Sequence, residues 1–291
     1  MTTPLERYGR AAARSSAVVI GEYSTSFGLA VRLLPRPTRA HIRNVYALVR
    51  LADEIVDGVA AAAGVPADRI VAALDDLEAD TYRAMETGYS TNLVVHAFAS
   101  TARAVGIEQA IVTPFFTSMR MDLVRASHTD ASFAEYVDGS AEVVGLMCLR
   151  AFVAAGPART PEQLAILEAG ARRLGAAFQK VNFLRDLAAD SEGLGRAYFP
   201  GVDVTRLDEP TKLRLLADID ADLAAAAAAL PLLERGPRRA VALAHGLFEE
   251  LAARIRTTPA ATLRTTRIRV PDPAKARLAA LAVAGRLPRR R

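Results

Sequence analysis

The stretch that decides the fold is Asn44-Val45-Tyr46-Ala47-Leu48-Val49-Arg50-Leu51-Ala52-Asp53-Glu54-Ile55-Val56-Asp57. On an α-helix, residues advance by about 100° each, so positions three and four apart lie on one face. Such a face carries the residues Tyr46, Arg50, Asp53 and Asp57, and most residues between them are apolar. Since buried charges need partners, the stretch predicts a largely buried helix with a charged stripe.

A second stretch repeats this pattern: Gln179-Lys180-Val181-Asn182-Phe183-Leu184-Arg185-Asp186-Leu187-Ala188-Ala189-Asp190. Its polar face consists of Gln179, Asn182, Asp186 and Asp190. Two carboxylates four residues apart repel each other, at a cost of roughly a few tenths of a kcal/mol. A hard cation such as Mg²⁺ would offset that repulsion. Each stretch also has a structural interpretation, which is a solvated edge for the first and a salt-bridge network for the second.

Apolar residues recur at spacings of three and four along nearly the whole chain, and Ala, Leu, Arg and Glu dominate. This pattern predicts an all-α protein. The helices that it predicts span residues 44–59, 68–85, 91–105, 114–126, 133–155, 161–189, 210–230 and 237–257. Proline and glycine mark the breaks between them.

Length and composition limit the number of domains and the cellular compartment that we expect for this chain. A chain of 291 residues with 51% hydrophobic and 24% charged residues is typical of a globular protein with a substantial core. Both acidic stretches must face one cavity, which predicts a single domain over residues 1–291 with a core at about 15–280. The single cysteine, Cys148, excludes an intramolecular disulfide and favours a reducing compartment. With neither a signal-like start nor a run of about 18 apolar residues, we expect a cytoplasmic protein.

The positive charge is almost entirely arginine. Lysine and arginine number 37 against 32 acidic residues, a net charge of +5, and only three of the basic residues are lysine. Arginine suits phosphate recognition because its planar fork donates two hydrogen bonds at once. The basic tail at 286–291 is interpreted as a solvated end or as a weak electrostatic hold on an anionic membrane. No motif supports nucleic-acid binding, and no pattern indicates the oligomeric state.

Three further stretches each have two interpretations. Hydroxyl groups in Tyr23-Ser24-Thr25-Ser26-Phe27 either cap the next helix or bind a phosphate at its start. The glycines, Arg196 and Tyr198 in the stretch 191–200 form either a plain loop or a flap over an anion. Small residues at intervals within 136–147, which begins with Tyr136, serve either core packing or the wall of a hydrocarbon tunnel.

Together these stretches resemble the squalene/phytoene synthase family. Its first acidic motif is similar to Tyr46-Ala47-x-x-Arg50-x-x-Asp53-Glu54-x-x-Asp57. Its second is similar to Gln179-x-x-Asn182-Phe183-Leu184-Arg185-Asp186-x-x-x-Asp190 with the following Gly195-Arg196-Ala197-Tyr198-Phe199-Pro200. Ser24-Thr25-Ser26-Phe27 resembles an early Ser-x-Ser-Phe element of the family. The resemblance implies an all-α isoprenoid synthase fold around a central cavity, and an enzyme that joins two prenyl diphosphates head to head.

The resemblance also implies roles for single residues. Mg²⁺, or Mn²⁺ in its place, would be held by Asp53, Asp57, Asn182, Asp186 and Asp190. The catalytic residues would be Tyr46, Arg50, Asp53, Asp57, Asp186 and Asp190. The residues expected to bind substrate are Tyr23, Ser24, Thr25, Ser26, Phe27, Tyr46, Arg50, Tyr136, Gln179, Asn182, Arg185, Arg196, Tyr198 and Arg267.

Two positions depart from the family pattern. Glu142 stands where the family often has a small residue, and Phe248 stands about where a family tyrosine often contacts substrate. The late phosphate-binding arginine is matched by Arg267 or by Arg264.

Within the family the chain looks most like bacterial members that couple two geranylgeranyl diphosphates to phytoene, a step of carotenoid biosynthesis. One alternative is squalene or dehydrosqualene synthesis from farnesyl diphosphate. Further alternatives are a terpene cyclase and a non-catalytic assembly factor with the same fold. The sequence contains no Gly-x-Gly-x-x-Gly motif and no additional C-terminal membrane helix, which disfavours a synthase that uses NADPH.

Overall fold

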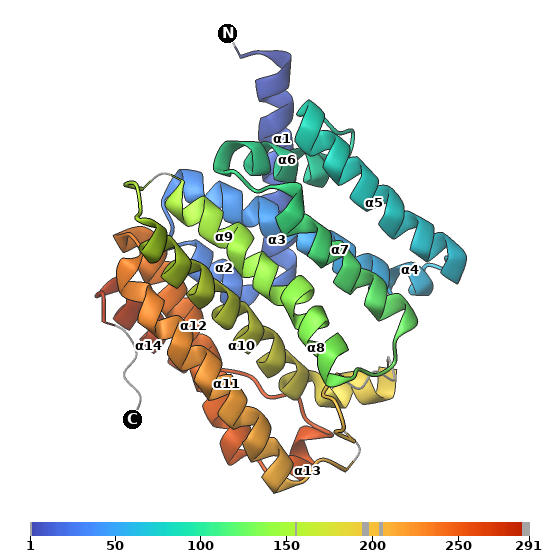
Figure 1. Ribbon diagram of the computed structural model, residues 1–291, viewed down its shortest axis with the longest axis vertical. Coiled ribbons are helices and arrows are strands. Elements are labelled where there is room, and N and C mark those ends of the chain that lie inside the picture. The colour runs from blue at the N-terminus through green and yellow to red at the C-terminus, as the bar shows by residue number, and fades with distance from the viewer. Residues whose placement is uncertain (1, 155, 194–197, 204–205, 287–291) are drawn as a thin grey trace.

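The computed structural model describes residues 2–154, 156–193, 198–203 and 206–286, with side chains left out at 188–193. Within these ranges all the secondary-structure elements are helices, which confirms the predicted all-α class (Figure 1). The α-helices are α1 (Pro4–Tyr23), α2 (Thr25–Val31), α3 (Arg36–Val56), α4 (Val59–Ala62), α5 (Ala67–Thr87), α6 (Leu93–Val105), α7 (Gln109–Val124), α8 (Asp130–Val137), α9 (Val143–Val153), α10 (Pro161–Gly193), α11 (Glu209–Ala229), α12 (Arg235–Thr257), α13 (Ala260–Leu263) and α14 (Asp272–Val283). A π-helical segment, Asp138–Glu142, joins α8 to α9, and a 3-10 turn, Leu230–Leu232, follows α11.

Local sequence signals account for many of the helix ends. Thr3 and Glu6 form a capping box at α1, and the Asn92 carboxamide accepts hydrogen bonds from the first turn of α6. Gly88 and Gly106 end α5 and α6 in the left-handed conformation, which glycine adopts without steric cost.

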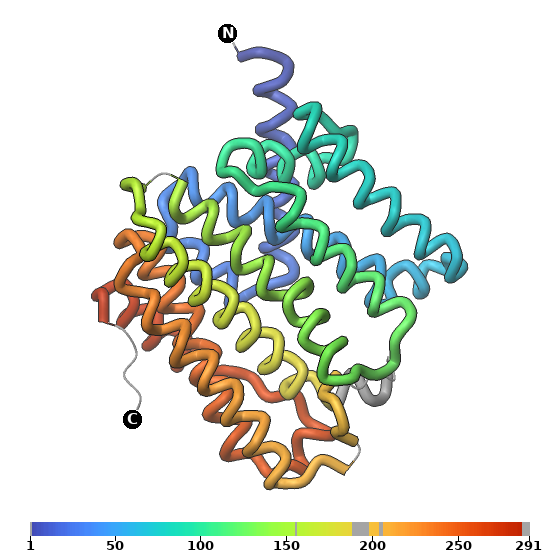
Figure 2. Tube along the Cα trace, viewed as in Figure 1, coloured from blue at the N-terminus to red at the C-terminus, as the bar shows by residue number. Residues whose placement is uncertain are grey.

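The helices form one bundle in which α10 runs between α9 and α11 (Figures 1 and 2). Among the described residues, the two larger of three hydrophobic cores lie on either side of a central space. The first core joins α10, α11, α12 and α14 through residues such as Leu184, Leu216, Leu247 and Leu278. The second joins α3, α5, α6, α7 and α9 through residues such as Leu48, Leu74, Phe98, Phe115 and Met147. This arrangement leaves the inner faces of α3 and α10 opposite each other across the centre.

Two helix starts differ from the sequence prediction by five residues or more. Helix α3 starts at Arg36, eight residues before the predicted start at residue 44. Helix α7 starts at Gln109 and carries Pro114 inside it, although the predicted start was residue 114. Proline was given too much weight as a boundary, because near a helix start it removes few internal hydrogen bonds.

The predicted helix 133–155 is also wrong, because it is divided by the π-helical segment 138–142. The segment lies against α7, where a Cβ atom on Gly139 would be only 2.1 Å from the Pro114 carbonyl oxygen. Here Ser118 Oγ donates a hydrogen bond to the Tyr136 carbonyl at 3.1 Å. The close contact gives glycine a packing role that helical periodicity does not reveal. Among all the described residues, no helix is long and apolar enough to cross a membrane.

Candidate active site

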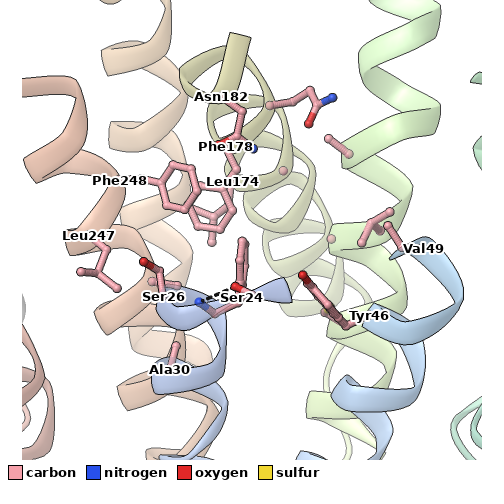
Figure 3. A pocket seen from close by; sticks show the side chains of 18 of the residues that line it. Ser24, Ser26, Ala30, Tyr46, Val49, Leu174, Phe178, Asn182, Leu247 and Phe248 are labelled. Atoms are coloured by element: carbon pink, nitrogen blue, oxygen red, sulfur yellow. Dashed lines mark hydrogen bonds between the residues drawn. The ribbon is translucent and has the colours of Figure 1, made fainter. Parts of the chain in front are cut away.

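A cavity of about 860 Å³ occupies the space between the two cores. Side chains from α2, α3 and α10 face one another across it (Figure 3). All the predicted site residues that the structure describes with side chains line this one cavity: Tyr23, Ser24, Thr25, Ser26, Phe27, Tyr46, Arg50, Asp53, Asp57, Tyr136, Gln179, Asn182, Arg185, Asp186, Tyr198 and Arg267. The side chain of Asp190 and the whole of Arg196 lie outside the described residues. The roles of all these residues stay predictions.

Arg50 organises the polar wall that α3 contributes. It forms an ion pair with Glu54, and its guanidinium lies 3.9 Å from an Asp53 carboxylate oxygen. The guanidinium carbon stands 4.4 Å from the centre of the Tyr23 ring, a cation–π contact. Three groups therefore fix the direction in which the planar fork of Arg50 points.

Asp53 and Asp57 concentrate negative charge at the end of α3. Burial, assisted by Asp57 and Asp122 and opposed by Arg50, raises the pKa of Asp53 from 3.8 to about 7. The helix ends at Val56, so Asp57 is the C-cap and not a residue within the helix. Gly58 follows at φ +108, a conformation that stops the helix. An anion at a helix C-terminus is disfavoured by the helix dipole, so a bound cation would relieve both carboxylates.

Helix α10 contributes the opposite polar wall. Asp186 accepts a hydrogen bond from Arg185 Nε at 2.9 Å and pairs with Arg267 Nε at 2.7 Å. Arg267 comes from the segment between α13 and α14, so it ties the C-terminal part of the chain to this helix. One turn before Asp186, the Asn182 side-chain oxygen is buried with no hydrogen-bond partner. An unpaired buried oxygen is costly, and a ligand of positive character would satisfy it.

These residues fit a hard divalent cation, although they do not form a ready-made cage. Among the described side chains, no three His, Cys, Asp or Glu residues stand together around a metal position. Arginines are paired with the carboxylates of Asp53 and Asp186 instead. The fit rests on two observations: the unpaired oxygen of Asn182, and the carboxylates of Asp53 and Asp57 that repel each other. Carboxylate and amide oxygens are the ligands that Mg²⁺ prefers in proteins.

Helix α2 forms the floor of the view in Figure 3. The Ser24 hydroxyl accepts a hydrogen bond from the Phe27 N–H at 3.1 Å, which confirms the capping interpretation of this stretch. Phe27 packs against Phe178 and Phe248, at ring-centre distances of 5.5 and 5.9 Å. Phe178 and Phe248 stack at 3.8 Å. Phe248 is thus part of an aromatic wall, and it lacks the hydroxyl group of the family's tyrosine.

Asp122 on α7 is a cavity residue that the sequence analysis missed. It accepts a hydrogen bond from the Tyr136 hydroxyl at 2.9 Å, and both side chains are buried. Burial, together with Asp122, raises the pKa of Tyr136 well above its ordinary value, so the phenol keeps its proton. The signal was a carboxylate among the apolar residues Met119, Met121, Leu123 and Val124. Nothing in that run showed which face of the helix the carboxylate occupies.

Glu142 does not belong to the cavity wall; it lies 3.6 Å from Arg172 as an ion pair. In contrast, Ser140, Ala141 and Gly145 of the same stretch line the cavity. Gly145 is also pressed against α10, since a Cβ atom there would be 2.4 Å from the Ala171 carbonyl oxygen. The small residues in 136–147 therefore have the predicted packing role, and their role as the wall of a hydrocarbon tunnel stays a prediction.

The other end of the cavity is apolar. Its wall is made of apolar residues from α9, α10, α11, α12 and the turn before α12, among them Leu149, Phe152, Leu167, Gly170, Ala226, Ala229, Leu233 and Ala240. The cavity thus changes along its length from carboxylates and arginines to hydrocarbon. Such a space suits a ligand with an anionic head and a long apolar tail.

The all-helical bundle around a central cavity matches the isoprenoid synthase fold that the sequence predicted. The comparisons with known proteins give the particular group: residues 20–274 match the family model described as squalene/phytoene synthase, and the chain belongs to this family. Members of the family are prenyltransferases, and so is this protein.

Individual relatives agree with this assignment. The chain is 30% identical to a phytoene synthase from Mycobacterium tuberculosis, over 89% of this chain and 86% of the relative. It is 31% identical to a presqualene diphosphate synthase from Rhodopseudomonas palustris, over 76% of this chain and 71% of the relative. A crystal structure of a dehydrosqualene synthase superposes with a TM-score of 0.78 at 22% identity, over 97% of this chain and 99% of that one, which confirms the fold.

Proposed function

We propose that this prenyltransferase couples two molecules of geranylgeranyl diphosphate head to head to form phytoene, with Mg²⁺ as its cofactor. The observation that supports this most is a cavity with a polar end and an apolar end. A prenyl diphosphate has the same change of polarity along its length. The volume of about 860 Å³ is near the upper end of the roughly 300–1,000 Å³ usual for ligand pockets.

The arginines at the polar end are proposed to bind the diphosphates. Arg50, Arg185 and Arg267 come from three segments and line the same cavity. Each offers a planar fork that matches phosphate oxygens, and all three stabilise negative charge as it develops on a leaving group. When bound, Mg²⁺ would be held by Asp53, Asp57, Asn182, Asp186 and Asp190, and would supply further stabilisation of that charge.

The proposed reaction has two ionisations. In the first, the C1–O bond of one substrate breaks, and the diphosphate leaves with the electron pair. The double bond of the second substrate attacks the allylic cation, and loss of a proton closes a cyclopropane ring. In the second, the remaining diphosphate leaves, the skeleton rearranges, and another proton is lost. No hydride donor is needed for this product, so we propose no role for NADPH.

The aromatic wall is proposed to protect the cations. Phe27, Phe178 and Phe248 form one packed group on the cavity wall. Aromatic ring faces attract positive charge, and an apolar surface excludes the water that would quench a carbocation. Burial raises the pKa of Tyr46, whose phenol therefore stays protonated at neutral pH and is available as a hydrogen-bond donor to a departing oxygen.

The chain length of the substrate is the finest part of the proposal. One relative is named phytoene synthase, and this name supports a twenty-carbon substrate for the present chain. A relative of similar identity is named presqualene diphosphate synthase, and this observation favours the alternative, farnesyl diphosphate as substrate with a squalene or dehydrosqualene product.

The test is to incubate the purified protein and Mg²⁺ with geranylgeranyl or farnesyl diphosphate and to identify the hydrocarbon by mass spectrometry. We expect phytoene from the first substrate at the higher rate. Asp53→Asn and Asp186→Asn should each lose most activity while remaining folded, as circular dichroism would report. Asp218→Asn is the control, because Asp218 is exposed on α11. Variants that stay within a few-fold of the wild-type rate would contradict the proposed metal site.

A further inference from the structure

Seven arginines gather where α2 ends and where α3 and α12 begin. This arginine face consists of Arg32, Arg36, Arg39, Arg43, Arg235, Arg238 and Arg239. The two helix starts are neighbours in space, because a Cβ atom on Gly236 would lie 2.8 Å from Pro35. Within the part of the chain that the structure describes, no carboxylate lies within 4 Å of any of the seven guanidinium groups. Glu234 is the acidic residue next to this face in sequence, and it pairs with Arg159 at 3.0 Å.

The position of these charges runs against the preference of the helices that carry them. A helix N-terminus has partial positive charge and favours acidic residues in its first turn. Six helices of this chain follow that rule, with Glu6, Asp68, Asp130, Glu162, Glu209 and Asp272 in their first turns. Among the described helices that have no acidic residue there, α3 and α12 begin with arginines. Positive dipole ends and guanidinium groups therefore add up at one surface.

Several of the guanidinium groups are held in place by the backbone. Arg39 donates to the carbonyl oxygen of Leu34 at 2.8 Å, and Arg238 donates to that of Leu233 at 2.7 Å. Burial, with Arg39 and Arg32 nearby, lowers the pKa of Arg43. The Nε atoms of Arg39, Arg43 and Arg239 are buried with no hydrogen-bond partner. The charges are thus close together and fixed, yet they lack a counter-charge from the described chain.

The arginine face covers the apolar end of the cavity. Leu34, Leu233 and Ala240 line the cavity. The carbonyl oxygens of Leu34 and Leu233 accept the hydrogen bonds from Arg39 and Arg238. Arg39 and Arg238 therefore each contact a residue of the apolar part of the wall. Four of them, Arg32, Arg36, Arg235 and Arg238, are exposed to solvent.

We propose that the arginine face docks this protein on an anionic lipid surface. The occupant is a sheet of lipid headgroups and not a single phosphate, because the charges are spread over three elements and four of them point outward. Docking in this orientation brings the apolar end of the cavity next to the membrane, where long hydrocarbons dissolve. The reason for docking rests on the proposed function, whereas the binding itself does not.

The experiment is co-sedimentation of the full chain with vesicles, without substrate. One set contains phosphatidylcholine alone, and the other contains equal parts of phosphatidylcholine and phosphatidylglycerol. We expect binding to the anionic set only, and weaker binding as salt is raised, because ions screen surface charge. Each basic residue near an anionic surface contributes about fivefold to binding, so Arg32→Gln/Arg36→Gln/Arg235→Gln should bind about a hundredfold more weakly.

Two further variants control for charge and geometry. Arg10→Gln/Arg14→Gln/Arg69→Gln removes the same charge from exposed positions on α1 and α5, and it should bind within about threefold of wild type if binding is local. Arg32→Lys/Arg36→Lys/Arg235→Lys should keep binding, because a membrane attracts point charges, whereas a bidentate phosphate site would lose its fit. Thermal unfolding of each variant shows that the fold is intact.

Four results would overturn the proposal: equal binding to neutral vesicles, equal loss in the control variant, displacement by low concentrations of inorganic diphosphate, or binding to a mixed-sequence RNA instead of vesicles. Turnover measured on detergent-dispersed substrate separates this proposal from the proposed function. The glutamine variant should lose vesicle binding and keep that turnover. A wild-type protein that binds anionic vesicles yet makes no hydrocarbon would contradict the proposed function and leave the docking surface standing.

Discussion

Asp53 is the residue whose surroundings most favour a bound cation or a proton. Its carboxylate is partly buried, faces Asp57, and has Arg50 as its main positive neighbour. The raised pKa means that the metal-free fold holds a proton on Asp53 more tightly than the unfolded chain does. Its contribution to stability is therefore present in full below the unfolded pKa of 3.8 and is lost as the pH rises through about 7.

This sign leads to a pH prediction for the metal-free protein. In the presence of a chelator, the melting temperature of the wild type should fall relative to that of Asp53→Asn as the pH is raised from about 5 to about 8. Mg²⁺ should raise the melting temperature of the wild type and not that of the variant. Parallel curves for the two proteins across this range would show that Asp53 titrates normally.

Arg50 can be tested for binding against a purely structural role. It is fixed by Glu54, Asp53 and the Tyr23 ring. Arg50→Lys keeps the charge and loses the planar fork, so we expect about 10²-fold slower turnover at nearly the same melting temperature. Arg83→Lys, in a surface pair with Asp80, is the matched control. A lower melting temperature with unchanged turnover per folded molecule would assign Arg50 to neutralising its neighbours.

At the scale of elements, α9 and α10 approach so closely that only glycine fits at Gly145. Gly145→Ala should lower the free energy of unfolding by about 1–3 kcal/mol, because the backbone must move to admit the methyl group. Gly21→Ala on α1 is the control: no atom lies within 4 Å of its added Cβ, and alanine favours helix by about 1 kcal/mol. Chemical denaturation of both variants checks the contrast. Similar free energies for both would mean that α9 shifts freely against α10.

The sequence predicted most of the long helices, and one shared cavity for Asp53 and Asp186, because helical periodicity is a local property. Helix α3 and helix α10 present Asp53 and Asp186 to one cavity, as the spacing required. The π-helical segment 138–142 escaped prediction because it depends on how Gly139 packs against α7. Asp122 was missed because its position also depends on packing between helices. When a helix has apolar residues on several sides, its sequence does not show which side faces the cavity.

At the scale of the whole molecule, the apolar end of the cavity sets how much hydrocarbon fits. Ala244 on α12 lines this space and is 9% exposed. Ala244→Phe should lower kcat/KM for geranylgeranyl diphosphate relative to farnesyl diphosphate by at least about tenfold, because the longer tail competes with the ring. Ala253 lies on the exposed side of the same helix, so Ala253→Phe should leave the ratio of the two kcat/KM values unchanged. An equal loss on both substrates in Ala244→Phe would count against tail length as the cause.

Contacts between segments far apart in the chain could not be predicted from the sequence. The pairing of Arg267 with Asp186 joins residues far apart in the chain, and the contact of Gly236 with Pro35 forms the arginine face. Neither contact follows from a local pattern, because both depend on how whole helices are stacked. The sequence predicted an excess of arginine but not the surface on which it gathers.

Two cores separated by a cavity of about 860 Å³ also make the molecule compressible. Apolar walls do not hold water well, so part of this volume is void that disappears when the chain unfolds. Hydrostatic pressure favours the state with the smaller total volume. The ligand-free protein should therefore unfold at a lower pressure than the protein filled with a non-reactive prenyl thiodiphosphate, as intrinsic tyrosine fluorescence would report. Equal midpoint pressures would mean that the empty cavity is already collapsed or wet in solution.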